Sequence, residues 1–157
     1  MFIDNSRKTI EKIELNKKLT DEFPFLLPRN VFTDELLDNY DYSYTLLDEM
    51  PSGWKKSFGL KMCNELKKVL IETNCLDTFR IHQIKEKYGT LRIYSNFTND
   101  KLENVIGKYE DLSASTCLYC GKPAEYVTLG WISYLCEKCA KESHYYATFK
   151  RGYSKLQ

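Results

Sequence analysis

Four of the six cysteines stand in two Cys-x-x-Cys pairs, a spacing that suits a bound metal ion. The pairs are Cys117-Leu-Tyr-Cys120 and Cys136-Glu-Lys-Cys139, and fifteen residues separate them. Two residues between ligands let each pair present both sulfurs to one ion, and four thiolates close the tetrahedral shell of structural Zn²⁺. The sequence therefore predicts one structural zinc ion bound by Cys117, Cys120, Cys136 and Cys139.

Disulfides or a redox dithiol are the alternative interpretation of these cysteines. The first twenty residues contain no apolar core of a secretory signal, so we expect a reducing, cytoplasmic compartment. A redox Cys-x-x-Cys also needs no second pair at this distance. His144, five residues after Cys139, could replace a ligand but is better explained as an exposed helix residue. Cys63 and Cys75 fit buried, unreactive thiols.

A β-hairpin is predicted from residues 79–87 and 91–97, with a turn at Tyr88-Gly89. The register that follows pairs two sets of residues, Ile84 with Ile93 and Glu86 with Leu91. Because the apolar residues before His82 are out of phase with those after it, we expect a bulge near His82.

The opposite face of this hairpin would gather cations and one aromatic ring. We call this set the hairpin face; it consists of Gln83, Lys85, Lys87, Arg92 and Tyr94. Cations neutralise phosphate and a tyrosine ring stacks on a base, so the set suits a small anionic nucleotide. The alternative is that these side chains only solvate the outer face of a two-stranded sheet, which is common.

Sequence motifs of catalysis are missing from the chain. No phosphate-binding glycine loop, nucleophile elbow or His-Glu-x-x-His motif occurs. The two histidines, His82 and His144, have no evident serine or cysteine partner. An enzyme is therefore the less favoured class, and its remaining basis would be carboxylates brought together by the fold.

Charge is unevenly distributed, although the 157 residues sum to only +1. Residues 21–50 carry a net charge of −7 and residues 51–92 one of +5. Such asymmetry can reflect complementarity within the fold as easily as a polyanionic ligand. No apolar run approaches the roughly 18 to 20 residues needed to cross a bilayer, so we expect no membrane association.

The elements that must position these groups follow from apolar periodicity and capping residues. They are helices at residues 7–19, 33–37, 54–73 and 98–112, and two short strands at 125–129 and 131–135 around Gly130. We predict an α+β fold, a helix–β-hairpin–helix core followed by a C-terminal zinc ribbon. The expected segments are an irregular, acidic and aromatic helical region (1–50), the core (51–115), and the zinc ribbon with a C-terminal helix (116–157).

The order of three motifs resembles a known family. Met50-Pro-Ser-Gly-Trp54 opens a helix, Lys85-Glu-Lys-Tyr-Gly-Thr-Leu-Arg-Ile-Tyr94 forms the hairpin, and Gly130-Trp-Ile precedes the second cysteine pair. Across residues 50–140 the chain resembles small proteins encoded by bacteriophages and prophages, in which we expect a Lys-Glu-Lys-aromatic-Gly-Gly-Leu-Arg-aromatic hairpin and a C-terminal pair of zinc knuckles. Thr90 stands where that pattern has a second glycine, and residues 1–49 do not match it.

Three functions are weighed. The resemblance implies a non-catalytic counter-defence factor that sequesters a small anionic nucleotide signal or blocks a host defence protein, in the host cytoplasm. The second is a zinc-ribbon adaptor that contacts DNA, RNA or a transcription complex, which the near-zero net charge disfavours. The third is a protein–protein inhibitor that uses the acidic, tyrosine-rich residues 34–49. Each is compatible with a homo-oligomer.

Overall fold

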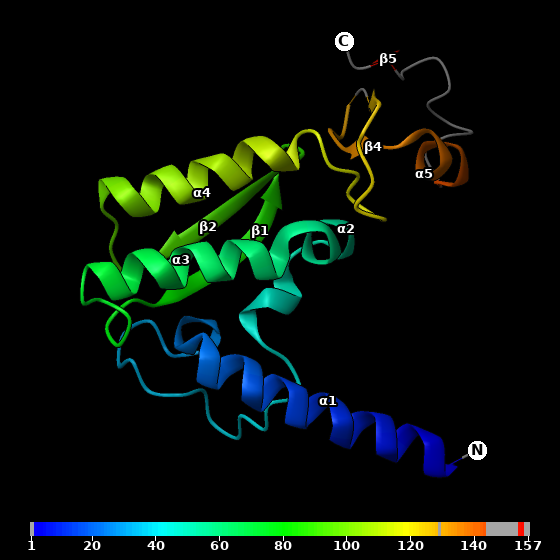
Figure 1. Cartoon of the computed structure of the whole chain (residues 1–157). Coiled ribbons are helices and arrows are strands. Elements are labelled where there is room, and N and C mark those ends of the chain that lie inside the picture. The colour runs from blue at the N-terminus through cyan, green and yellow to red at the C-terminus, as the bar shows by residue number, and fades with distance from the viewer. Residues whose placement is uncertain (1, 129, 144–153, 156–157) are drawn as a thin grey trace.

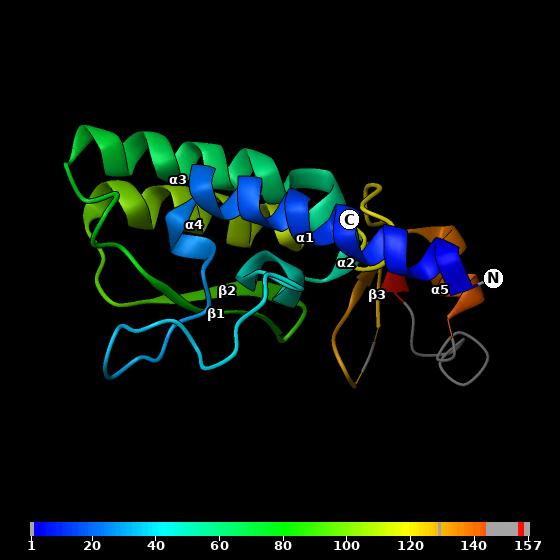
Figure 2. The ribbon, with the colours of Figure 1, turned by 90° about the horizontal axis from the view of Figure 1, so that it is seen from below.

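The computed structural model describes residues 2–128, 130–143 and 154–155 of the chain. Helices α3 (Leu60–Glu72) and α4 (Asp100–Ser113) lie side by side on one face of a hairpin made of β1 (Ile81–Lys87) and β2 (Thr90–Ser95) (Figures 1 and 2). The fold is thus of the mixed α+β kind that the sequence predicts. Among the described helices, none has both the length and the apolar character that a bilayer crossing requires.

The N-terminal helix is longer than predicted. Helix α1 spans Phe2–Glu22 rather than residues 7–19, because no proline or glycine interrupts the chain before Pro24. Its C-terminal half packs on the body through Asn16 and Thr20, which are buried. Residues 6–12 are exposed, and this half extends beyond the rest of the molecule (Figure 1).

The prediction of a short helix at residues 33–37 is wrong. The Asn30 side-chain oxygen accepts hydrogen bonds from the N–H groups of Phe32 (2.8 Å) and Thr33 (3.2 Å), which closes a turn there instead. Asp34 then adopts a φ of 58°, which no α-helix accommodates. The short helix η1 (Pro24–Leu26) precedes this turn, and the short helix η2 (Leu46–Glu49) follows it.

The helical prediction for residues 54–73 is confirmed, with one irregularity. The path runs through α2 (Ser52–Trp54), the π-helical turn η3 (Lys55–Gly59) and α3. The residues that face the core are Phe58, Met62, Leu66 and Leu70, all buried. The helix ends before Asn74, whose φ of 53° is incompatible with its continuation.

The hairpin register is the predicted one. Ile84 lies opposite Ile93 and Glu86 opposite Leu91, and the register shifts between Ile81 and Gln83, at the expected bulge. The two turn residues have φ values of 53° (Tyr88) and 80° (Gly89). Positive φ at both positions is the geometry of a type I′ turn, whose twist matches that of the flanking strands.

One apolar core holds most of the described chain together. It includes side chains from residues 23–50 as well as from 54–109: Phe23, Phe25, Leu26, Leu46, Leu47, Met50, Trp54, Phe58, Met62, Cys63, Leu66, Leu70, Phe79, Ile81, Ile84, Leu91, Leu102 and Tyr109. We call this the main core. The first segment therefore contributes to the main core, while the division into segments at residues 50 and 115 stays a prediction.

The cysteine-rich end lies beside one end of the hairpin (Figure 1). It contains β3 (Tyr126–Val127), β4 (Tyr134–Leu135) and α5 (Glu137–Glu142), and β5 (Ser154–Lys155) also pairs with β3. The two strands flank Gly130, as predicted. We call residues 116–128 and 130–143 the cysteine region. Its own buried cluster is small and consists of Cys117, Leu135, Cys136 and Ala140.

Candidate metal centre and ligand-binding surfaces

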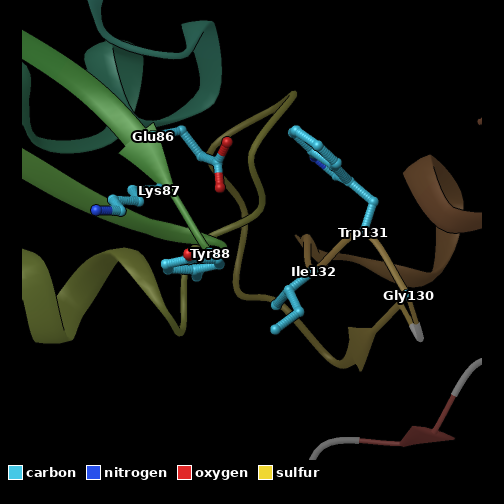
Figure 3. Close-up of a pocket in the computed structure, with 6 residues that line it drawn as sticks. All are labelled: Glu86, Lys87, Tyr88, Gly130, Trp131 and Ile132. Atoms are coloured by element: carbon cyan, nitrogen blue, oxygen red, sulfur yellow. The ribbon is translucent and has the colours of Figure 1, made fainter.

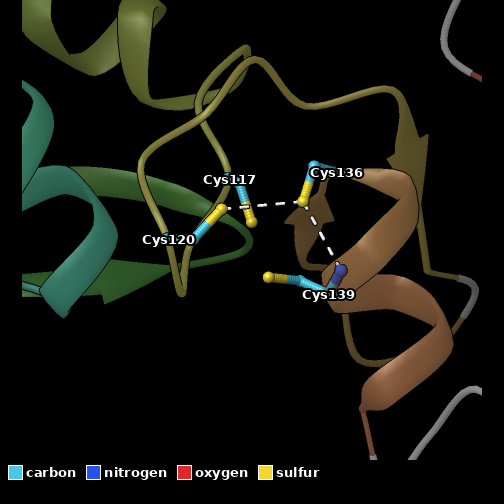
Figure 4. A group of neighbouring side chains, drawn as sticks. All are labelled: Cys117, Cys120, Cys136 and Cys139. Carbon is cyan, nitrogen blue, oxygen red and sulfur yellow. Dashed lines mark hydrogen bonds between the residues drawn. The ribbon is translucent and has the colours of Figure 1, made fainter.

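The four cysteines of the two pairs converge on one point (Figure 4). Their sulfur atoms all lie within 4.8 Å of one another. The Sγ atoms of Cys120 and Cys136 are 3.6 Å apart. Ligands at a Zn–S distance of about 2.3 Å in a tetrahedron would be about 3.8 Å apart, so the spacing of the sulfurs suits a shared ion. These four cysteines could therefore hold a metal ion.

Local backbone geometry brings the sulfurs together. Cys117 and Cys120 lie in the loop after α4, and Cys136 is the N-cap of α5, where its Sγ accepts the Cys139 N–H at 3.4 Å. The Gly121 φ of 78° turns the chain directly after the first pair. Each pair is thus arranged by residues next to it in sequence, and β3 and β4 bring the two pairs face to face.

The electrostatics of the cluster favour a bound cation. Burial opposes ionisation of the Cys117 thiol, but hydrogen bonds from backbone N–H groups, including that of Cys136, and from the Cys120 thiol lower its pKa to about 7. Burial raises the pKa of Cys136 and of Cys139, and the sulfurs of Cys117 and Cys120 add to both rises. Four adjacent thiolates therefore need a positive charge among them.

Helix α2 links the first cysteine pair to the main core through hydrogen bonds. The Gly53 N–H donates to the Leu118 carbonyl at 3.0 Å. The Ser52 hydroxyl donates to Tyr119 O and the Trp54 indole N–H to Thr116 O, both at 3.1 Å. The sequence identified Pro51-Ser-Gly-Trp54 only as the start of a helix and missed this contact. The sequence signal for this contact is the presence of two glycines, Gly53 and Gly121, at the point where the two segments approach most closely.

The structure places all five residues of the hairpin face on one side of the sheet. Gln83 lies opposite Tyr94 and Lys85 opposite Arg92. The Lys85 ammonium lies 4.8 Å from the centroid of the Tyr94 ring. Gln83, Lys87 and Tyr94 are exposed, and Lys85 and Arg92 are half-buried. That these residues bind a ligand stays a prediction.

Arg92 is the least available cation of the set. Its Nη1 donates to the Leu91 carbonyl at 2.6 Å and to the Thr90 hydroxyl at 2.7 Å. The same atom lies 3.8 Å from the carboxylate of Glu110 on α4. Within the described part of the chain, Lys85 and Lys87 take part in no ion pair. The two lysines therefore carry most of the free positive charge of this face.

The acidic and basic segments of the chain do neutralise each other in part. Three ion pairs join residues 21–50 to residues 51–92: Glu22 with Lys67 at 3.5 Å, Asp34 with Arg80 at 2.9 Å, and Asp48 with Lys55. These partly exposed pairs explain much of the charge asymmetry without any ligand. None of these three pairs uses a cation of the hairpin face.

A cavity that the sequence did not predict lies next to the hairpin turn (Figure 3). Its volume is about 310 Å³, and its lining residues, the turn pocket, are Glu86, Lys87, Tyr88, Gly130, Trp131 and Ile132. Tyr88 and Trp131 are 72% and 73% exposed. A tyrosine at a type I′ turn position, where asparagine or aspartate is usual, was the available signal.

Among the described residues, the remaining candidates add no ligand to the metal centre. His144 lies outside the described residues, and Cys63 and Cys75 belong to or pack against the main core. Comparison with known proteins finds no match, whether with a family model, with a curated protein or with a solved structure. The function must therefore be argued from the chain's own geometry.

Proposed function

We propose that this chain is a non-catalytic binding protein in which one structural Zn²⁺ stabilises a C-terminal zinc ribbon and the hairpin face binds a small anionic nucleotide. In the phage-type role that the motifs imply, it acts as a counter-defence factor in the host cytoplasm. There it sequesters a nucleotide signal or blocks a host defence protein. Binding needs no catalytic group.

The choice of zinc rests on the donor set. Four thiolates in a tetrahedral arrangement suit Zn²⁺ or an iron–sulfur centre. The sulfur spacing of 3.6 Å between Cys120 and Cys136 supports one ion at the centre of the cluster. Four protein ligands leave no open position for substrate, so the ion is structural. Elemental analysis of the purified protein should find one zinc per chain and no stoichiometric iron.

One observation carries the ligand proposal: two lysines without an ion pair among the described residues lie on the same strand face as an accessible tyrosine ring. Lys85 and Lys87 can neutralise a phosphate group, and Tyr94 offers a ring for a base. The ring already attracts the Lys85 ammonium, which holds the two side chains together for a ligand with both an anionic and an aromatic part.

The test is calorimetric titration with a panel of mono- and dinucleotides, with inorganic pyrophosphate as the anion alone. A charge-assisted contact to phosphate contributes about 1.5 to 3 kcal/mol, so Lys85→Ala should weaken binding roughly tenfold to a hundredfold. Lys61→Ala is the matched control, because it removes an equal charge from an exposed position on α3. Tyr94→Ala should cost a similar amount if the ring stacks on a base, and Tyr94→Phe little.

Two results would contradict this proposal. Full affinity in both Lys85→Ala and Lys87→Ala would mean that the face is only solvated. Tight binding of duplex or single-stranded nucleic acid that falls steeply with salt, without small-nucleotide binding, would favour the zinc-ribbon adaptor instead.

A further inference from the structure

The turn pocket lies between the β1–β2 turn and the loop that joins β3 to β4 (Figure 3). We propose that it binds a guanidinium group, such as an arginine side chain, at a site that shares only Lys87 with the hairpin face. The proposal goes beyond the anion-binding function and does not depend on it. It rests on two aromatic rings, one carboxylate, and the way the fold fixes them.

The rings of Tyr88 and Trp131 stand on opposite sides of the pocket (Figure 3). Both are nearly three-quarters exposed, and among the described residues neither ring packs against another ring. Ile132, which is 36% exposed, adds apolar surface at the same place. Large apolar side chains gathered at the surface mark interaction sites, since water solvates them poorly.

The strained backbone conformation of Tyr88 indicates a functional role for its ring. Its φ of 53° is in the left-handed region, which glycine, asparagine and aspartate adopt far more readily than a bulky residue. The turn therefore accepts strain that asparagine would relieve. What the tyrosine adds in return is an accessible ring at the mouth of the pocket.

Glu86 supplies the charge of the pocket. Its Oε1 accepts the Gly89 N–H at 2.5 Å, which fixes the side chain, and its carboxylate points toward Trp131 (Figure 3). Within the described residues Glu86 takes part in no ion pair. The Lys87 ammonium points away from Trp131 and lies 5.5 Å from the centroid of the Tyr88 ring. The space between the rings therefore faces a negative charge.

A guanidinium group satisfies every one of these features. It is planar and cationic, it stacks on aromatic faces, and it donates two parallel hydrogen bonds to a carboxylate. A phosphate would be repelled by Glu86. An ammonium group would gain the charge attraction but neither the flat stacking nor the paired hydrogen bonds.

Contacts within the chain shape the pocket. The Ser133 N–H donates to the Thr128 hydroxyl at 2.8 Å, and the same hydroxyl donates to the Trp131 carbonyl, which shapes the loop that carries the indole. A Cβ on Gly89 would lie 2.8 Å from both Ile132 Cγ2 and a Tyr134 ring carbon, so turn and loop are in close contact. Because the loop belongs to the cysteine region, the pocket should exist only while that region is folded.

Trp131 fluorescence provides the measurement. The chain has two tryptophans, and the other, Trp54, is fully buried, so a ligand in the pocket changes mainly the Trp131 signal. The full-length metal-bound protein is titrated with N-acetyl-arginine amide and with the citrulline analogue, which has the same shape without charge. We expect arginine to bind at least about tenfold more tightly than citrulline. The matched lysine derivative should rank between them.

Variants identify the groups responsible. Glu86→Gln keeps the acceptor for the Gly89 N–H but removes the charge, and should weaken arginine binding about tenfold. Glu103→Gln, an exposed carboxylate on α4, is the control and should change nothing. Trp131→Phe should abolish the fluorescence response while calorimetry still detects weakened binding. Tyr88→Asn should weaken arginine binding and raise the melting temperature, since it removes the ring and relieves the turn.

Lys87 separates this proposal from the proposed function. Lys87→Ala should weaken binding of anionic nucleotides but strengthen arginine binding, because it removes a competing cation from the Tyr88 ring. A blocked Gly-Arg-Gly peptide that binds more tightly than the amino-acid derivative would assign the guanidinium to a polypeptide, and equal affinity to a small molecule. Equal binding of citrulline, or full arginine affinity in Glu86→Gln, would overturn the guanidinium site whatever the nucleotide titrations give.

Discussion

The main core and the cysteine region achieve order by different means. In the main core, eighteen buried residues between Phe23 and Tyr109 pack into one apolar cluster. In the described cysteine region the buried cluster has four members, and two of them are cysteines of the metal centre. Apolar burial can stabilise the first, but a segment with so small a core needs another source of free energy. From this comparison we expect the second region to need a bound cation for its fold.

Two of the contacts between the regions differ in kind. At α2 the joint is polar, made of backbone carbonyls of the first cysteine loop and donors from Ser52, Gly53 and Trp54. At the hairpin turn the joint is apolar, between Gly89 and the side chains of Ile132 and Tyr134. A metal ion bound by the four cysteines would therefore order surfaces beyond its own ligands.

Removal of the metal should produce the largest difference between the regions. Cys136→Ser, or treatment with a strong chelator, should abolish amide-exchange protection in the cysteine region while α3, α4 and the hairpin keep theirs. Zinc binding to small sites contributes about 10 to 16 kcal/mol, which this region cannot replace by burial. Hydrogen-exchange mass spectrometry measures this directly, with Cys75→Ser as the control. Amide-exchange protection that survives in the metal-free cysteine region would contradict the expectation that this region needs a cation for its fold.

Gly53→Ala tests the polar joint. A Cβ there would overlap the Cys117 carbonyl and lie 2.7 Å from Gly121 N and from Leu118 O, all backbone atoms that side-chain rotation cannot move. We expect a loss of about 1 to 3 kcal/mol in unfolding free energy and a lower metal affinity. Gly107→Ala is the control: nothing lies within 4 Å of its Cβ, and α4 should gain about 0.5 to 1 kcal/mol. A neutral Gly53→Ala would show that the regions are not tightly joined.

Cys63 sharpens the contrast between the two kinds of cysteine. It is fully buried in the main core, and burial raises the pKa of its thiol to about 12. Cys63→Ala should cost about 1 to 2 kcal/mol of stability through lost packing and leave the zinc content unchanged. Alkylating reagents should modify Cys63 only when the main core unfolds. Modification under native conditions, or loss of zinc in the variant, would contradict this assignment.

Asp48, which lies in η2 next to the main-core residue Leu47, tests the smallest effect. Burial opposes its ionisation, but hydrogen bonds from the Lys55 ammonium and the Thr45 N–H outweigh it and hold the pKa below 3.8. A carboxylate with a depressed pKa stabilises the fold above its unfolded-state pKa, and this stability is lost as the pH falls through the folded value. Asp48→Asn should therefore cost less than about 1 kcal/mol at pH 7, with a smaller difference near pH 3. Denaturant melts at both pH values measure it, and an equal cost at both would remove the electrostatic explanation.

Sequence alone determined those features that depend on neighbours along the chain. The spacing of the cysteine pairs, the two-residue turn that sets the Ile84–Ile93 register, and the Asn99 side chain that caps α4 all act within a few residues. Local geometry restricts such features strongly, so their patterns could be predicted. Two errors show the limit of such local predictions. The boundaries of α1 were wrong because a helix can extend wherever no residue stops it. The helix expected at residues 33–37 was wrong because the Asn30 side chain closes a turn there instead.

Only the tertiary structure decided how distant segments meet. Nothing local relates Gly53 to Cys117, or Glu86 to Trp131, because each contact depends on how α2 and the hairpin turn pack on the cysteine region. The same holds for ion pairs. The fold places the Glu110 carboxylate next to Arg92, whereas Lys85 and Lys87 take part in no ion pair with the described residues. Contacts between residues far apart in sequence come from packing of whole elements, and a periodic pattern shows which face is buried but not what that face meets.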